Sequence, residues 1–167
     1  MVRNYSQLPE LDWSEYKPDQ FTYRGKWIDN WFSNMVVTPF KTHDGVEYAS
    51  VENFYQSCKA IEWDDRFRIS QTKSPSWAKQ EGRRINIRKD WEDIKYLSMW
   101  TGLCYKFSHQ HPDQVKKLLD SNDVIVEWNN WGDRIWGADV KTGKGRNILG
   151  IMLMDLRTIL ISSYRKS

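Results

Sequence analysis

The C-terminal stretch of this chain constrains the fold more than any other segment. A helix that is apolar around most of its surface is buried in a core rather than laid on one. Between residues 147 and 160 apolar side chains recur on nearly every side of a helix: Ile148, Leu149, Ile151, Met152, Leu153, Leu156, Ile159 and Leu160. We therefore expect a helix that begins near Asn147 and is central to the core.

Four shorter helices are predicted before this segment. Ser50, Ser74 followed by Pro75, Asp90 and Pro112 mark their starts, because these residues favour the first positions of helices. Short β-like stretches lie at residues 21–23, 35–38, 46–48 and 124–126, with a turn at 43–45. The strand–helix alternation of a doubly wound sheet is absent. The sequence thus predicts an α+β, mainly helical single domain with a small antiparallel sheet.

The length of 167 residues fits one domain. We expect an irregular N-terminal arm over residues 1–20, packed through Trp13 and Tyr16, and a catalytic domain over residues 21–163. There is neither a run of about 20 apolar residues nor the apolar core of a signal peptide. A cytoplasmic location with no membrane partner is therefore expected, in keeping with two isolated cysteines, Cys58 and Cys104.

Several chemistries lack their motifs. The chain has no dinucleotide-binding glycine fingerprint, no H-E-x-x-H and no G-x-S-x-G, and residues 141–147 do not complete a phosphate-binding P-loop. His109 and His111 are two residues apart at a helix end, which is poor spacing for a metal. We expect neither a metal nor a cofactor.

A polar stripe on the first helix carries the clearest chemistry. Glu52, Gln56 and Lys59 lie at helical spacing i, i+4 and i+7, so they share a face. A carboxylate and an amine that project into one cleft can move protons, and a lysine can attack the open form of a sugar to give a Schiff base. The competing interpretation is an ordinary solvated helix face.

An aromatic and glycine-rich loop follows at residues 128–137. Trp131 offers a face that can stack on a base, Gly132 allows backbone to approach a ligand, and Asp133 can bind ribose hydroxyls or act as a base. The alternative is a loop that packs tryptophan onto the core. Further on, Lys144, Arg146 and Asn147 enter the last helix, whose free N–H groups would favour a phosphate; the alternative there is a solvated basic loop.

The order of motifs is more specific than any one of them. Tyr23-Arg24-Gly25 is followed by Trp31-Phe-Ser33-Asn34, by Ser50-Val-Glu52-Asn-Phe-Tyr55-Gln56-Ser-Cys-Lys59 and by Ser74-Pro-Ser-Trp-Ala-Lys-Gln-Glu-Gly82-Arg83. Then come Arg88-Lys-Asp-Trp91, Trp131-Gly132-Asp133, and Gly143-Lys144-Gly-Arg-Asn147. Over roughly residues 21–160 this succession resembles the NADAR (YbiA-like) family.

The resemblance implies an α+β fold and N-glycosidase chemistry on ribosylated substrates. The implied substrates are ADP-ribose on guanine in DNA or RNA, or a phosphoribosylated intermediate of riboflavin synthesis. The implied catalytic residues are Glu52, Lys59, Trp91 and Asp133. The implied pocket residues are Arg24, Gly25, Asn34, Gln56, Gly132 and Asn147. We expect Ser33, Tyr55, Trp131 and Lys144 to bind substrate as well.

We favour removal of ADP-ribose from guanine in nucleic acid. Two further alternatives are a module that binds NAD or ADP-ribose without cleaving it and a stacking-type nucleic-acid-binding protein. A formal net charge of +3 and the lack of a long basic stripe argue against the last of these. The sequence leaves the oligomeric state open.

Overall fold

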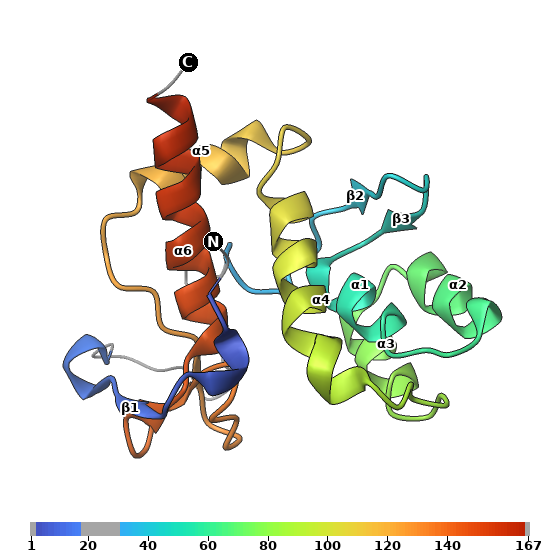
Figure 1. Cartoon of the computed structure of the whole chain (residues 1–167), viewed down its shortest axis with the longest axis horizontal. Coiled ribbons are helices and arrows are strands. Elements are labelled where there is room, and N and C mark those ends of the chain that lie inside the picture. Colours follow the sequence, from blue (N-terminus) through green and yellow to red (C-terminus); the bar gives the residue numbers. More distant parts are fainter. Residues whose placement is uncertain (1–2, 18–30, 166–167) are drawn as a thin grey trace. The chain divides into compact units, whose positions relative to one another are not determined.

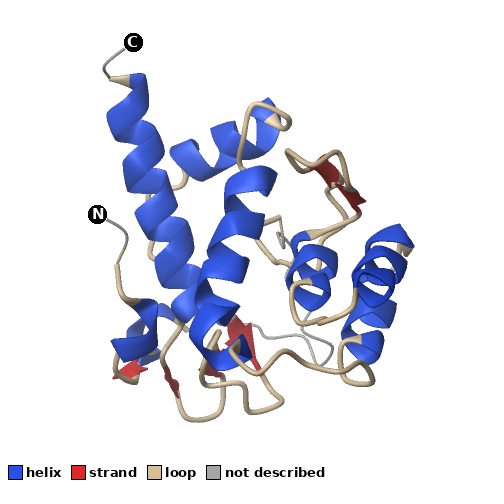
Figure 2. Cartoon of the chain, turned by 45° about the vertical axis from the view of Figure 1, so that its right-hand side comes forward, coloured by secondary structure: helices blue, strands red, loops and turns tan. Residues whose placement is uncertain are grey.

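The computed structural model describes residues 3–17 and 31–165. Helices predominate within these ranges, with short strands between them (Figures 1 and 2). The α+β, mainly helical class expected from the sequence is confirmed. The predicted strand at 21–23 lies outside the described residues, as do Arg24 and Gly25. The chain forms two compact units, one of residues 32–116 and one of residues 1–31 with 117–167.

The unit of residues 32–116 contains a two-stranded hairpin and four helices. In the antiparallel hairpin, Phe40 in β2 lies opposite Tyr48 in β3, and the turn contains Gly45 at a φ of 85°. Helix α1 packs against each of the other three helices of this unit. The bounds are β2 Phe40–Lys41, β3 Glu47–Tyr48, α1 Val51–Ser57, α2 Trp63–Gln71, α3 Pro75–Glu81 and α4 Trp91–Lys106.

Helix α5 (Pro112–Asp120) runs across the boundary between the units in the sequence, and α6 (Ile148–Tyr164) is the last element. β1 (Leu11–Asp12) pairs antiparallel with β6 (Lys144–Gly145), whereas β4 (Trp128–Asn129) pairs parallel with β5 (Ala138–Asp139). Two of the three strand pairs are therefore antiparallel. The predicted strands at 35–38 and 124–126 do not form; strands occur a few residues later in both places.

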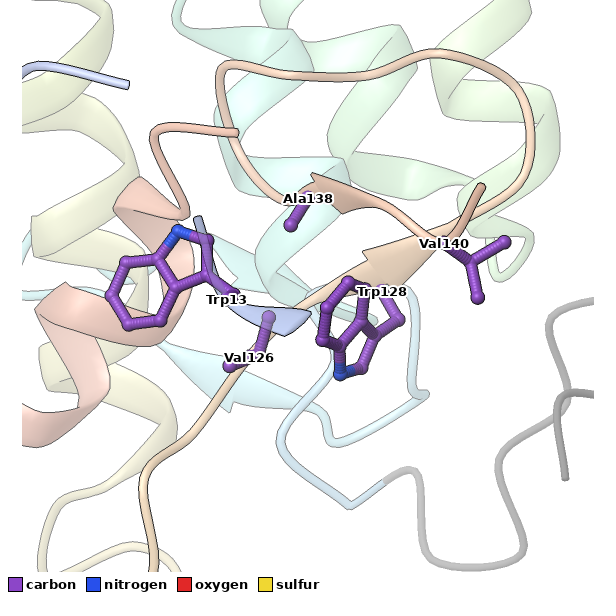
Figure 3. Packing of buried hydrophobic residues seen from close by; sticks show 5 residues of the cluster. All are labelled: Trp13, Val126, Trp128, Ala138 and Val140. Atoms are coloured by element: carbon purple, nitrogen blue, oxygen red, sulfur yellow. The ribbon is translucent and has the colours of Figure 1, made fainter. Parts of the chain in front are cut away.

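The core of the second unit joins segments that are far apart in the sequence. Trp13, Val126, Trp128, Ala138 and Val140 form a buried cluster with Ile151 packed against it (Figure 3). The indole N–H of Trp13 donates a hydrogen bond to the carbonyl of Gly145 (2.9 Å). The N-terminal segment thus packs through Trp13 as expected, and it adds strand β1 to this unit; Tyr16 stays exposed.

Helix α6 begins one residue after Asn147, as predicted. Its first three turns are buried through Ile148, Leu149, Met152, Leu153 and Leu156, and beyond them Ile159 is exposed. The apolar side chains of α6 are therefore buried mainly in its N-terminal half. None of the described helices is both long and apolar enough to cross a bilayer.

Candidate active site

Helix α1 places the polar stripe inside the fold. Ser50 caps the helix, its hydroxyl oxygen accepting a hydrogen bond from the backbone N–H of Asn53 (3.2 Å). Because α2, α3 and α4 surround α1, almost every face of this short helix is covered. Glu52 and Gln56 are each only 4% exposed. The interpretation of the stripe as an ordinary solvated face is therefore wrong.

Two side-chain amides hold the Glu52 carboxyl group. Asn34 Nδ2 donates to Oε2 (2.5 Å) and Gln56 Nε2 donates to Oε1 (2.6 Å). The backbone N–H of Glu52 donates in turn to the carbonyl of Asn34 (2.9 Å), which ties the loop before β2 to the start of α1. Each carboxyl oxygen has its own donor, so the group is fixed in one orientation.

Burial raises the pKa of Glu52 above its ordinary value of 4.5, because desolvation penalises the carboxylate. The hydrogen bond from Gln56 and the positive charges of Lys79, Lys59 and Arg83 act in the opposite direction. A carboxyl group with a raised pKa keeps its proton to higher pH than a solvated one, as a general acid requires.

Lys59 lies just beyond the end of α1, beside two aromatic rings. Its Nζ is 5.5 Å from the ring centroids of both Tyr55 and Trp91, and these rings meet edge to face at 5.0 Å. Among the described residues the ammonium group has no hydrogen-bond acceptor. Burial lowers the pKa of Lys59 below 10.5, while the negative charge of Glu52 partly offsets this. A lowered pKa makes the neutral, nucleophilic amine more abundant.

A short backbone pairing brings Trp91 to Lys59. The N–H of Arg88 donates to the carbonyl of Lys59 (2.9 Å), and Ala60 and Ile87 form an antiparallel bridge. The chain then enters α4 at Trp91. The segment after α1 is thereby fastened to the start of α4, which places an indole ring over the lysine.

Ser33 binds a buried lysine through its backbone carbonyl group. Its side chain is buried and its hydroxyl oxygen accepts from the N–H of Met35 (3.2 Å). The carbonyl of Ser33 accepts a hydrogen bond from Nζ of Lys106 (2.8 Å), a lysine with 0% exposure. Lys106 was not predicted from the sequence, because a lysine late in an amphipathic helix gives no sign of burial.

The glycine-rich loop belongs to the other unit. One carboxyl oxygen of Asp133 accepts from the N–H groups of Ile135 and Trp136, at 3.0 Å each, and closes a turn. Its second oxygen has no partner among residues 3–17 and 31–165. Trp131 is 60% exposed, and Gly132 has a φ of 82°. The exposed aromatic face expected here is therefore present, and Gly132 is in the left-handed conformation that favours glycine.

The start of α6 differs from the expectation of free N–H groups. The amides of Ile148 and Leu149 donate to the carbonyls of Ile135 (3.1 Å) and Trp136 (3.0 Å). Asn147, fully buried, accepts from the N–H of Glu127 and donates to the carbonyl of Ile125, both at 2.9 Å. The helix start is thus occupied by the fold, which corrects the predicted phosphate site at these amides.

Comparison with known proteins decides the family. The model of the family described as "NADAR domain" matches residues 16–161, most of the chain and both compact units. The chain belongs to the NADAR family. The family predicted from the motif order is confirmed, and so is the coarser part of the predicted activity, a hydrolase of the N-glycosidase class.

Individual NADAR relatives support this. N-glycosidase YbiA of Escherichia coli (strain K12) is 34% identical over 128 residues, covering 75% of this chain and 78% of YbiA. The NMR structure of E. coli YbiA matches with a TM-score of 0.73 and 31% identity, covering 82% of this chain and 81% of that one. A riboflavin biosynthesis protein of Zea mays, PYRR, is 25% identical over 186 residues, which is 100% of this chain and 30% of PYRR.

Half of the NADAR site residues named from the sequence lie in the unit of residues 32–116. These are Ser33, Asn34, Glu52, Tyr55, Gln56, Lys59 and Trp91. The others, Trp131, Gly132, Asp133, Lys144 and Asn147, lie in the second unit. Their roles toward substrate stay predictions, as do those of Arg24 and Gly25.

Two further features bear on ligands. A cavity of about 730 Å³ lies between the β2–β3 hairpin and the second half of α4, with Lys41, His43, Trp100, Cys104 and Tyr105 in its wall, and it contains none of the predicted site residues. Within the described residues no three His, Cys, Asp or Glu side chains gather as metal ligands would.

Proposed function

We propose that this NADAR protein removes ADP-ribose from guanine in nucleic acid by hydrolysing the bond between the base nitrogen and C1 of the ribose. The observation that carries the proposal is the pair formed by Glu52 and Lys59. The carboxyl group is buried and held by two amides, and the half-buried amine lies beside Tyr55 and Trp91. Their pKa values are displaced toward each other.

Lys59 is the proposed nucleophile. Its neutral amine attacks C1 as the C1–N bond to the base breaks and the departing base takes a proton, through an oxocarbenium-like state. Opening of the sugar ring gives an imine between C1 and Nζ. Water then adds to the imine, which releases ADP-ribose and restores the lysine.

Glu52 is the proposed proton donor and acceptor in these steps. Because the carboxyl group is fixed by Asn34 and Gln56, it meets the substrate in one orientation. Its raised pKa favours the protonated form that a departing base requires.

The direct test uses a short DNA or RNA that carries ADP-ribosylated guanine. Purified protein is incubated with it, and free ADP-ribose is measured by mass spectrometry. We expect release by the wild type and its loss in Glu52→Gln and in Lys59→Ala. Glu62→Gln and Lys73→Ala, which change exposed residues of the same types, serve as controls. Full activity in Lys59→Ala with a native circular dichroism spectrum would falsify the covalent route.

A second candidate substrate is a phosphoribosylated intermediate of riboflavin synthesis. The similarity to maize PYRR, a riboflavin biosynthesis protein by name, favours it. The same assay with a phosphoribosylated aminopyrimidine separates the two substrates. If neither substrate is cleaved, both substrate proposals fail and the enzyme acts on another N-glycoside.

A further inference from the structure

Two basic side chains at the end of α3 lack acidic partners among the described residues. They are Lys79, which is half-buried, and Arg83, which is exposed. Neighbouring arginines are different. Arg68 and Arg84 both bind the buried Glu81, and Arg88 forms two hydrogen bonds with Asp90. The positive charges of Lys79 and Arg83 are thus not compensated within this part of the chain.

These two residues flank a direct contact with the catalytic helix. Gly82 lies between them, and a Cβ at that position would be 1.9 Å from Oε1 of Gln56. Gln56 is the residue whose amide donates to Glu52. The end of α3 therefore contacts the Gln56 amide that orients Glu52. Lys79 and Arg83 lie in the sequence on either side of this contact.

The electrostatics of the site give an independent indication. The charges of Lys79 and Arg83 both act on Glu52, and both act on Lys59, lowering the pKa of each. The two basic side chains therefore act on the same carboxyl group and the same amine. Positive charges that act on one site repel one another, and an anionic ligand bound by Lys79 and Arg83 would relieve the repulsion.

The alternative phosphate-binding segment is already occupied. The guanidinium group of Arg146 donates to the carbonyls of Leu8 (2.7 Å), Tyr5 (2.9 Å) and Ser6 (2.8 Å), so it fastens the N-terminal segment. The first amides of α6 donate to backbone carbonyls as well. A phosphate group of the substrate would therefore have to bind elsewhere than at the start of α6.

We propose that Lys79 and Arg83 bind the phosphate on the 5′ oxygen of the ribose whose C1 is attacked. This inference rests on the proposed function, but it holds for both candidate substrates, because ADP-ribose and ribose 5-phosphate share that group. Arginine binds phosphate through paired N–H groups and lysine as a point charge. The phosphate holds the sugar while Lys59 and Glu52 act at its other end.

Kinetics with matched variants test the proposal. Lys79→Ala and Arg83→Ala are compared with Arg84→Ala, which removes the same charge from the next residue. We expect KM to rise about ten- to hundred-fold in the first two, the loss typical of a charge-assisted contact, and to change little in Arg84→Ala. On the same substrate without its 5′ phosphate, the wild type and the three variants should have similar KM values. Unchanged KM values for the phosphorylated substrate would overturn the proposal.

A binding measurement separates this proposal from the proposed function. Ribose 5-phosphate and ribose are titrated into each protein by calorimetry. We expect wild type and Arg84→Ala to bind the phosphorylated sugar, and Lys79→Ala and Arg83→Ala to lose that preference. If wild type cleaves no substrate but shows this pattern, the phosphate site stands and the proposed function fails. If wild type cleaves substrate and binds both sugars equally, the phosphate site is wrong.

Discussion

The side-chain oxygen of Gln56 occupies the space beside Gly82 where any other residue would place its Cβ, 1.9 Å away. The same Gln56 side chain donates its amide hydrogen to Glu52 (2.6 Å). The glycine that follows α3 therefore leaves room for the amide that holds a carboxyl group on α1. The position is buried, and a side chain there would displace the Gln56 amide that holds Glu52.

Gly82→Ala is expected to cost about 1–3 kcal/mol of unfolding free energy, the range for overpacking a core. It should also reduce kcat, because Gln56 is displaced from Glu52. Urea unfolding followed by circular dichroism measures the first effect, and the glycosidase assay measures the second.

The double variant Gly82→Ala with Gln56→Ala is the matched control. Shortening Gln56 removes the atom that the new methyl group would meet, so the Gly82→Ala cost should shrink in that background. An equal cost in both backgrounds would show that the contact with Gln56 is not the cause.

Glu52 should make stability depend on pH in a direction opposite to that of an ion-paired carboxylate. Its folded pKa is raised above 4.5, so between that value and the raised pKa the folded protein holds a proton that the unfolded chain has released. Stability therefore falls as pH rises through this window and is level above it. Glu52→Gln does not titrate there.

The difference in unfolding free energy between Glu52→Gln and wild type isolates this effect, because other titrating groups largely cancel. We expect the variant to gain relative to wild type as pH rises through the window. Urea titrations at several pH values provide the measurement. A difference that stays constant with pH would mean that Glu52 has the same pKa in the folded and unfolded states.

Helices whose start signals are local were predictable from the sequence. Ser74 caps α3 with its side chain, and Pro75 stands at the first position, as expected. Helix α2 was missed because it has few apolar residues: Trp63 and Phe67 remain about half exposed, and only Ile69 is fully buried. The strands shifted by a few residues because their pairing is decided by partners elsewhere in the chain.

The active site was predictable only in part, for a similar reason. Helical spacing placed Glu52, Gln56 and Lys59 on one face. Whether that face is solvated depends on Asn34 and Gly82, which belong to other segments. Their contacts with Glu52 and Gln56 cover the face, and helical spacing alone does not reveal them. The spacing of four residues between Lys79 and Arg83, with a glycine between them, is visible in the sequence. That neither side chain has an acidic partner among the described residues could be learned only from the structure.

The N-terminal segment is expected to stabilise its unit through Trp13. Trp13→Ala should lower the free energy of unfolding by about 3–5 kcal/mol, as for other buried tryptophans. Trp13→Phe keeps a ring but loses the 2.9 Å bond to Gly145, at a cost of about 1 kcal/mol. Tyr16→Ala, at an exposed ring, is the control. Urea unfolding that gives equal losses for Trp13→Ala and Tyr16→Ala would contradict this role.

The pH dependence of catalysis should report the charges around Lys59. Attack needs the neutral amine, so kcat/KM should rise with pH through the lowered pKa of Lys59 in the free enzyme. Arg83 and Lys79 lower that pKa, while Glu52 and Glu92 raise it. Arg83→Ala should therefore move the acidic limb of the profile to higher pH, and Glu92→Gln should move it to lower pH.

The pH profile of Lys59 acylation by a limiting amine reagent, followed by peptide mass spectrometry, measures the same pKa without any substrate. The two profiles should shift together in each variant and stay in place in Arg84→Ala. Borohydride added during turnover should also leave the sugar bound to Lys59, because it reduces the imine to a stable amine. A kinetic limb that stays in place while the acylation profile shifts would assign the limb to another group and remove Lys59 from the chemical step.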